Sequence, residues 1–502
     1  MCRFSRRSNS TYGGVDQFDS ACRMDDNGPI FPHCFASPFA RSPVSAMLRI
    51  TAMFVLGLLC LSNATRAEDL ASRVRDLAEP FVKSERAMGM SIGVISGDQR
   101  LTVHVGAVCK GGPQASDETV YEIGSISKVF TGLMLADAVA TDRMRLDQPA
   151  GDFLPEGVEM PRWKNTAITL THLSTHRSGL PRLPDNMRDV ASDNPYARYT
   201  STQAFEFLKS HSLRRAPGAE GEYSNFAVAL LGDLICRDAE RSYDEQLRER
   251  ITGPLGMDAT SVELSDSMRS TMATPHDAGL KVTSTWEFAD LPGAGGIRSN
   301  VDDMLTFAQA NLEPPEDNVG DAIESAWRQH QATTGSASAM GLGWHVAGDG
   351  QTRWHNGGTG GFRSMLMINR DQKIAVVILC NTSCDAVDAL ATQIMVELAN
   401  ANVVSTSSET PVEVDVALEK MKRLEGRYQL APTFIFDVRV RDGKLMVGIT
   451  NQPTHQVYAK SETEWFYKVV PASLAFKMGA DGKCMSLELL QNGIRQTASR
   501  VK

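Results

Sequence analysis

At 502 residues, the chain is long enough for about two or three domains of ordinary size. Its composition, 42% hydrophobic and 22% charged, is that of a globular protein that can form sizeable cores. The formal net charge of −9 argues against a nucleic-acid-binding protein, because contact with phosphates needs a basic face.

The first segment with a readable pattern is MLRITAMFVLGLLCLSNATRAED, which begins at Met47. Arg49 precedes the apolar run 50–61, and small residues follow it. This pattern predicts a signal peptide over residues 47–67, with a run too short to span a bilayer. Residues 1–46 carry no periodicity, so we expect them to be an upstream extension and translation to start at Met47. The alternative is an internal core helix.

The cysteines that follow this leader are scattered and odd in number: Cys109, Cys236, Cys380, Cys384 and Cys484. They cannot all pair, and their spacing fits no zinc pattern. HLSTH at 172–176 has the histidine spacing of a zinc helix but lacks a glutamate after the first histidine, so we interpret it as structural. We therefore expect neither a metal site nor a cofactor.

The composition changes at residues 401–415, ANVVSTSSETPVEVD, which are polar and contain Pro411. A polar segment without a sustained period is typical of a linker. It would separate a domain over residues 68–400 from a second one over residues 416–502.

The two parts differ in their periodicity. Helical patterns dominate residues 125–310, and strands are expected near 91–108 and 362–380, which indicates a mixed α/β domain. After the linker, apolar and polar residues alternate between turn signals. Those signals are Asp442-Gly443, Asp481-Gly482 and Asn492-Gly493. The tail is therefore expected to form a small all-β domain, a closed or nearly closed barrel.

The segment EIGSISKVF, residues 122–130, places Lys128 three positions after Ser125. On a helix these positions share a face, so the amine can take the hydroxyl proton if burial lowers its pKa. Gly124 and the apolar VFTGLMLADAV predict a tight turn into a buried helix, whose N-terminus favours negative charge near the serine. The alternative is a helix-capping serine beside a surface lysine.

Two further motifs follow in order. PGAEGEYSNFAVALLGDLI places Tyr223 and Asn225 between a Pro-Gly turn and an apolar helix, and RWHNGGTGGFRSMLMI places His355 before an apolar strand. S-x-x-K, Y-x-N and a K/H-x-G strand, in this order, resemble the serine β-lactamase and penicillin-binding-protein superfamily. The tyrosine makes the chain similar to the class C β-lactamase branch, which also holds D-alanyl-D-alanine carboxypeptidases, D-amino-acid peptidases and esterases.

Four supporting stretches resemble the same branch: ITLTHLSTHRSGLP at 168–181, ITGPLGM at 251–257, AGGIRSNVDDM at 294–304 and GLGW at 341–344. The resemblance covers roughly residues 70–400. It implies an antiparallel sheet flanked by helices, with an additional all-helical region. The tail resembles the lipocalin-like β-barrel often appended to such hydrolases.

The resemblance also implies roles for individual residues. Ser125 would be the nucleophile, Lys128 its activating amine, and Tyr223 a general base with a pKa lowered by the lysine. Asn225 would orient the substrate amide and Lys128.

For the substrate carbonyl, the resemblance implies an oxyanion hole made by the backbone N–H groups of Ser125 and Gly358, with Gly357 allowing a close approach. His355 is a further catalytic candidate and Asn356 a candidate substrate-binding residue, and both depart from the commonest third motif, in which a lysine is followed by threonine. A mostly neutral histidine binds a carboxylate more weakly than lysine, which puts efficient β-lactam hydrolysis in doubt. His355 is instead a candidate hydrogen-bond donor to the Tyr223 oxygen.

Arg353 and Arg363 flank the third motif and are candidates to restore positive charge there, the alternative being solvated surface positions. The resulting expectation is an exported, periplasmic or envelope serine hydrolase that forms an acyl-enzyme with D-alanyl peptides or β-lactams. A carboxylesterase of the same branch and a non-catalytic binding protein are the alternatives. No nucleic acid and no stable membrane span are expected.

Overall fold

A computed structural model describes the following residues: 68–187, 193–332, 338–406, 413–431, 434–450, 454–468, 472–479, 482–491 and 494–501. The expected extension 1–46, the signal peptide 47–67 and the turn Asn492-Gly493 lie outside these residues. The hydrolase-like part and the C-terminal barrel are each described by themselves.

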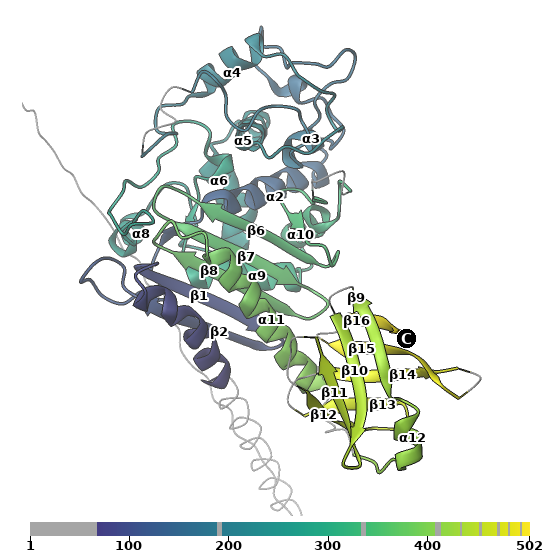
Figure 1. Ribbon diagram of the computed structural model, residues 1–502. Coiled ribbons are helices and arrows are strands. Elements are labelled where there is room, and N and C mark those ends of the chain that lie inside the picture. The colour runs from purple at the N-terminus through teal and green to yellow at the C-terminus, as the bar shows by residue number, and fades with distance from the viewer. Residues whose placement is uncertain are drawn as a thin grey trace, which may run out of the picture. The chain divides into compact units, whose positions relative to one another are not determined.

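An antiparallel six-stranded sheet forms the centre of the first part, in the order β2-β1-β8-β7-β6-β5 (Figure 1). Its strands are β1 Gly89–Ser96, β2 Gln99–Gly106, β5 His345–Val346, β6 Thr352–Gly358, β7 Arg363–Asn369 and β8 Ile374–Cys380. The strands expected near 91–108 and 362–380 are thus β1 with β2 and β7 with β8. Every residue of β8 is buried, which explains its unbroken apolar sequence IAVVILC.

Both faces of the sheet are covered. On one face, Val377 of β8 packs in a core with Met304 and Leu305 of α9, Val301–Leu312. On the other, Val376 packs in a second core with Leu390 of α11, Val387–Thr406. The helix over residues 68–83 contributes to that second core. The alternation of side chains along the strand therefore feeds two separate cores.

Helices dominate the region between β2 and β5, as the sequence predicted, and Figure 1 shows α3, α4 and α5 on the β6 side of the sheet. The α-helices are α2 Ser127–Ala140, α3 Leu170–Ser174, α4 Ser201–Ser210, α5 Asn225–Ala239, α6 Tyr243–Leu247, α7 Gly253–Leu255, α8 Asp266–Thr271 and α10 Asn318–Trp327. The short 3₁₀ and π turns are η1 Gly124–Ile126, η2 Ala150–Phe153, η3 Arg248–Thr252 and η4 Pro292–Ala294. A two-stranded antiparallel ribbon pairs β3 Tyr121–Glu122 with β4 Arg298–Ser299.

Helix α11 continues to Thr406, so the first six positions of the predicted linker 401–415 are helical. Residues 407–412 lie outside the described part of the chain, and the domain boundary there stays a prediction. No helix within the described ranges has the length and apolar character needed to cross a membrane.

The tail forms a closed eight-stranded antiparallel barrel, which confirms the expected all-β domain. It contains α12 Leu418–Lys422 and the strands β9 Gly426–Ala431, β10 Phe434–Arg441, β11 Lys444–Ile449, β12 His455–Ala459, β13 Glu464–Tyr467, β14 Ala472–Met478, β15 Cys484–Gln491 and β16 Ile494–Val501. Asp442 and Gly443 join β10 to β11, both with positive φ, as a tight hairpin turn of the predicted type requires. Phe436, Trp465 and Leu487 are among the side chains that fill the barrel interior.

Candidate active site

The S-x-x-K motif spans the 3₁₀ turn η1 and the first turn of α2. The Lys128 Nζ atom lies 2.9 Å from Ser125 Oγ and donates a hydrogen bond to the Ala294 carbonyl at 2.6 Å. Lys128 has no solvent exposure, and this burial, reinforced by the charge of Arg182, lowers its pKa far below the ordinary value. The amine is therefore poised to accept the serine proton.

The backbone around Ser125 requires glycine at two places. Gly124 has φ of 50°, in the left-handed region, and a side chain there would meet the Gly358 nitrogen at 2.7 Å. At Gly357 a Cβ atom would lie 2.0 Å from the Ile123 carbonyl oxygen. The end of β6 therefore packs directly on the turn that carries Ser125, an arrangement that two converging backbone N–H groups of an oxyanion hole would require.

Tyr223 and Asn225 flank the start of α5. Ser224 caps this helix by accepting a hydrogen bond from the Ala227 N–H at 2.9 Å. The carbonyl of Arg182 accepts from the N–H groups of Asn225 and Phe226. The Y-x-N segment is thus fixed by satisfying N–H groups that a helix start leaves unpaired.

The hydroxyl of Tyr223 interacts with the Ser125 side chain, and Lys128 Nζ lies 5.1 Å from the centre of the tyrosine ring. Burial raises the pKa of Tyr223 to about 12, although the interaction with Ser125 opposes this shift. The sequence predicts the opposite shift, with the lysine lowering this pKa. The result is opposite because desolvation dominates and because Lys128 itself favours its neutral form.

The Asn225 side chain does not contact Lys128 in the described contacts. Its amide nitrogen donates to the Tyr196 hydroxyl at 3.1 Å, while its buried Oδ1 has no partner there. Because Asn225 lines the same pocket as Ser125, this oxygen is available to accept a substrate N–H.

Three histidines surround Tyr223. The rings of His176, His345 and His355 lie 4.3, 6.3 and 6.3 Å from the tyrosine ring, centre to centre. Burial holds the pKa of all three below the ordinary histidine value, that of His345 at about 4, so they are neutral at pH 7.

His355 occupies the third motif on β6 and is fully buried. Its Nδ1 lies 2.6 Å from the Asn356 carbonyl oxygen, and its Nε2 has no partner among the described residues. An Nδ1–H donating to that carbonyl leaves Nε2 as an acceptor. In this form His355 does not serve as the donor to the Tyr223 oxygen that the sequence suggested.

The polar residues beside His355 form hydrogen bonds and ion pairs with groups that do not line the pocket. The Asn356 amide donates to Asp388 of α11 at 2.6 Å, and Arg363 pairs with both Asp388 and Asp385. Arg353 is buried and donates to the Trp327 carbonyl at 2.9 Å. Neither arginine supplies the free positive charge for which both were candidates, and Asn356 is not among the residues that line the pocket.

A pocket of about 240 Å³ opens at Ser125. The residues that line it are Ser125, Arg182, Leu183, Pro195, Tyr196, Asn225, Trp286, Phe288, Ala294, Gly295 and Gly358. Tyr196 stacks on Phe288 at 4.9 Å and tilts against Trp286 at 5.1 Å, which makes one wall aromatic. The pocket therefore offers apolar contact beside a small set of polar groups.

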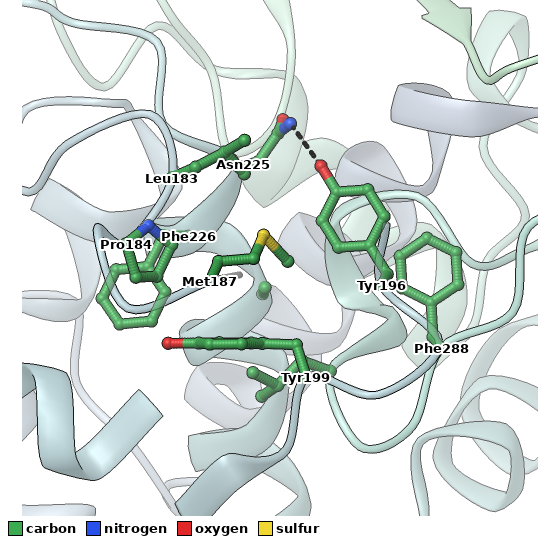
Figure 2. A pocket seen from close by; sticks show the side chains of 10 residues that line it. Leu183, Pro184, Met187, Tyr196, Tyr199, Asn225, Phe226 and Phe288 are labelled. Carbon is green, nitrogen blue, oxygen red and sulfur yellow. Dashed lines mark hydrogen bonds between the residues drawn. The ribbon is translucent and has the colours of Figure 1, made fainter. Parts of the chain in front are cut away.

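A smaller apolar recess of about 20 Å³ shares Leu183, Tyr196, Asn225 and Phe288 with this pocket. Figure 2 shows Tyr196 between the Asn225 amide, to which it is hydrogen bonded, and the ring of Phe288. Met187 and Tyr199 complete much of the remaining wall. The recess has room for a water-sized or methyl-sized group next to the pocket.

No group of three or more histidine, cysteine, aspartate or glutamate side chains in the described ranges is arranged to hold a metal ion. The five cysteines of the described chain, Cys109, Cys236, Cys380, Cys384 and Cys484, are free thiols.

Comparison with known proteins shows which family has this fold and these motifs. The family model for beta-lactamase matches residues 74–399, which is more than half of the chain. The chain belongs to the beta-lactamase family. Its relatives are serine hydrolases, and this chain is an enzyme of that type.

Individual members of the beta-lactamase family resemble this chain over about three fifths to two thirds of its length. The chain is 28% identical over 336 residues to the D-alanyl-D-alanine-carboxypeptidase/endopeptidase AmpH of Escherichia coli K12, covering 63% of this chain and 84% of that protein. It is 28% identical over 301 residues to a beta-lactamase of Yersinia enterocolitica, covering 59% and 74%. The solved structure of a beta-lactamase/D-alanine carboxypeptidase from Yersinia pestis, complexed with citrate, has the same fold, with a TM-score of 0.56 at 24% identity over 66% of this chain and 98% of that one.

Four residues of this beta-lactamase family site were not singled out from the sequence: His176, Arg182, Tyr196 and His345. His176 belongs to the HLSTH segment interpreted as structural, yet its ring packs 4.3 Å from Tyr223 and its Nδ1 accepts the Ser224 N–H. His345 directly follows the GLGW stretch. Adjacency to a recognised motif was the available signal for these two and for Arg182, which directly follows the stretch 168–181, whereas Tyr196 had none.

Proposed function

We propose that this chain is an exported serine hydrolase that forms an acyl-enzyme at Ser125 with amide substrates such as D-alanyl peptides or β-lactams. The observation that supports this most directly is the 2.9 Å approach of Ser125 Oγ to a fully buried lysine amine. A neutral amine at that distance is a general base for a hydroxyl nucleophile.

Acylation begins when Ser125 Oγ bonds to the substrate carbonyl carbon and its proton passes to Lys128 Nζ. The backbone N–H groups of Ser125 and Gly358 stabilise the negative charge that develops on the carbonyl oxygen. The bond to the leaving group then breaks, and the leaving nitrogen takes a proton, with the Tyr223 hydroxyl as the nearby relay. Water attacks the ester carbonyl, releases the acid and returns the proton to Ser125.

Two sources of support favour D-alanyl peptides. A similar protein is named a D-alanyl-D-alanine-carboxypeptidase/endopeptidase, and the methyl-sized recess beside Asn225 matches an alanyl side chain. The free Asn225 Oδ1 can accept the N–H of a peptide bond on the substrate.

A carboxylesterase is the second candidate, because the β6 side of the site lacks a free cation among the described residues. Arg363 is paired with Asp385 and Asp388, Arg353 is bonded to backbone carbonyls, and His355 is neutral. A neutral ester needs no carboxylate anchor at that position.

Export is proposed from the predicted signal peptide over residues 47–67. Periplasm or cell envelope is the compartment consistent with a peptidoglycan-type substrate. Mass spectrometry of the N-terminus of the protein recovered from the envelope tests this, with a start near residue 68 expected and a retained leader arguing against it.

The function itself is tested by Ser125→Ala. This change should abolish covalent labelling by a fluorescent penicillin or a fluorophosphonate, while the melting temperature stays close to that of the parent protein. Profiling the parent against D-alanyl peptides, nitrocefin and short acyl esters then identifies the acyl donor. Labelling of Ser125→Ala at the parent rate would show that another residue is the nucleophile.

A further inference from the structure

Arg182 lies at the active-site pocket and is fixed there by its backbone. Its carbonyl accepts the N–H groups of Asn225 and Phe226 at 3.1 and 3.2 Å, at the start of α5. Its guanidinium lies 5.2 Å from the centre of the Tyr223 ring, and Lys128 Nζ lies 5.1 Å from the same point. Because both groups lie about 5 Å from the same ring centre, the Arg182 guanidinium is at most about 10 Å from the Lys128 amine.

The charge of Arg182 stands alone in this pocket. Among the described residues that line it, Arg182 is the one that carries a full charge, and none is acidic. The side chain is exposed and makes no ion pair or hydrogen bond within the described part of the chain. Arg363, by contrast, is held between Asp385 and Asp388.

The groups around Arg182 do not compete with it for an anion. Burial lowers the pKa of Lys128 and His176, and the positive charge of Arg182 contributes to both shifts. The neighbouring base and imidazole are thus neutral, and the positive potential of the pocket is concentrated on one guanidinium. A guanidinium presents paired N–H groups that match the two oxygens of a carboxylate.

We propose that Arg182 binds a carboxylate on the acyl donor, so that this enzyme acylates faster with anionic substrates than with neutral ones of the same shape. The aromatic wall of Tyr196 and Trp286 would hold the apolar part that connects this carboxylate to the reacting carbonyl. The inference rests on the proposed acyl-enzyme chemistry at Ser125.

The test uses pairs of alkyl fluorophosphonates at several chain lengths. In each pair, one probe ends in a carboxylate and the other in a carboxamide. Ser125 Oγ bonds to phosphorus, fluoride leaves, and the hydroxyl proton passes through Lys128 to solvent. Intact-protein mass spectrometry gives the labelling rate constants of the full chain. At its best chain length the carboxylate probe should react about fivefold faster than its carboxamide partner, the scale of one solvent-exposed ion pair.

Arg182→Gln should bring this ratio close to one by slowing the carboxylate probe more than the carboxamide probe, and high salt should reduce the ratio in the parent protein. Arg214→Gln removes the same charge from an exposed arginine that does not line the pocket, and it should leave the ratio intact. A parent ratio of one at every chain length, or a ratio that survives Arg182→Gln, would overturn the inference.

Equal slowing of both probes by Arg182→Gln would also overturn it, because Arg182 would then act through Tyr223 rather than on the substrate. Failure of both probes to label Ser125 at any chain length would instead refute the proposed acyl-enzyme function. The two failures are therefore distinguishable.

Discussion

The active-site pocket and the interior of the C-terminal barrel both bury aromatic side chains, yet they treat polar groups differently. In the barrel, Tyr428 donates its hydroxyl hydrogen to the Leu424 carbonyl at 2.7 Å, and most of the core is apolar. Around Ser125, His176 and His355 each keep a buried Nε2 atom without a described partner, beside the fully buried Lys128.

A buried polar group without a partner costs about 1–3 kcal/mol of stability, so the two regions follow different rules. The interior of the barrel is mostly apolar, with the Tyr467 hydroxyl as an unpartnered exception in its described part. The pocket gives up stability to hold titratable groups in their neutral forms, which is typical of a catalytic site. Changes in the pocket should therefore affect chemistry more than stability, and the first prediction tests this directly.

The largest effect is expected for Lys128→Met. Methionine fills similar buried space but cannot accept a proton, so the rate of Ser125 labelling should fall by about 10³-fold. The melting temperature should change little, because the substitution removes a buried polar group along with its bond to Ala294. Lys83→Met, at an exposed lysine, is the matched control. Labelling of Lys128→Met at the parent rate would remove Lys128 from the mechanism.

The pH dependence of acylation separates Lys128 from Tyr223 as the base. The base-competent form of Lys128 is the neutral amine, and its pKa is far below the ordinary value. The labelling rate should therefore rise about tenfold per pH unit below that pKa and reach a plateau well below pH 10. Tyr223, with a pKa of about 12, stays protonated throughout. A rate that keeps rising beyond pH 10 would point to the tyrosinate instead.

A smaller loss, of about 10²-fold in kcat/KM, is expected for Gly357→Ala. Its Cβ atom would lie 2.0 Å from the Ile123 carbonyl, so β6 must shift and the Gly358 N–H leaves its place near the substrate oxygen. Gly348→Ala is the control, since a Cβ atom at that position meets nothing within 4 Å and φ is not positive. Near-parent activity of Gly357→Ala would mean that this close approach is not needed for catalysis.

Much of this architecture was readable in the sequence because the signals are local. Gly124, Ser125 and Lys128 lie within five positions, and Asp442-Gly443 specifies its own hairpin. The alternating pattern of the tail predicted the barrel for the same reason.

The burial and charge partners of the site side chains could not be predicted from the sequence, because they depend on residues far apart in the chain. The rise in the pKa of Tyr223 comes from burial by segments that meet only in the folded protein. The pairing of Arg363 with Asp388 requires α11 to lie against β7, a contact that no motif announces. Arg182 was overlooked because an exposed arginine in a loop has no sequence signature of its own.

The smallest effect on catalysis is expected when the barrel is removed. A chain ending after Thr406, the last residue of α11, keeps every residue that lines the pocket. If the barrel interior serves stability alone, this chain should melt in one cooperative step and label at Ser125 within about twofold of the full-length rate. Thermal melts and labelling rates of the two chains make the comparison. Aggregation of the shortened chain, with rescue by the separately produced barrel, would instead mean that the two parts share a core. The contrast between the barrel interior and the active-site pocket would then no longer describe two independent regions.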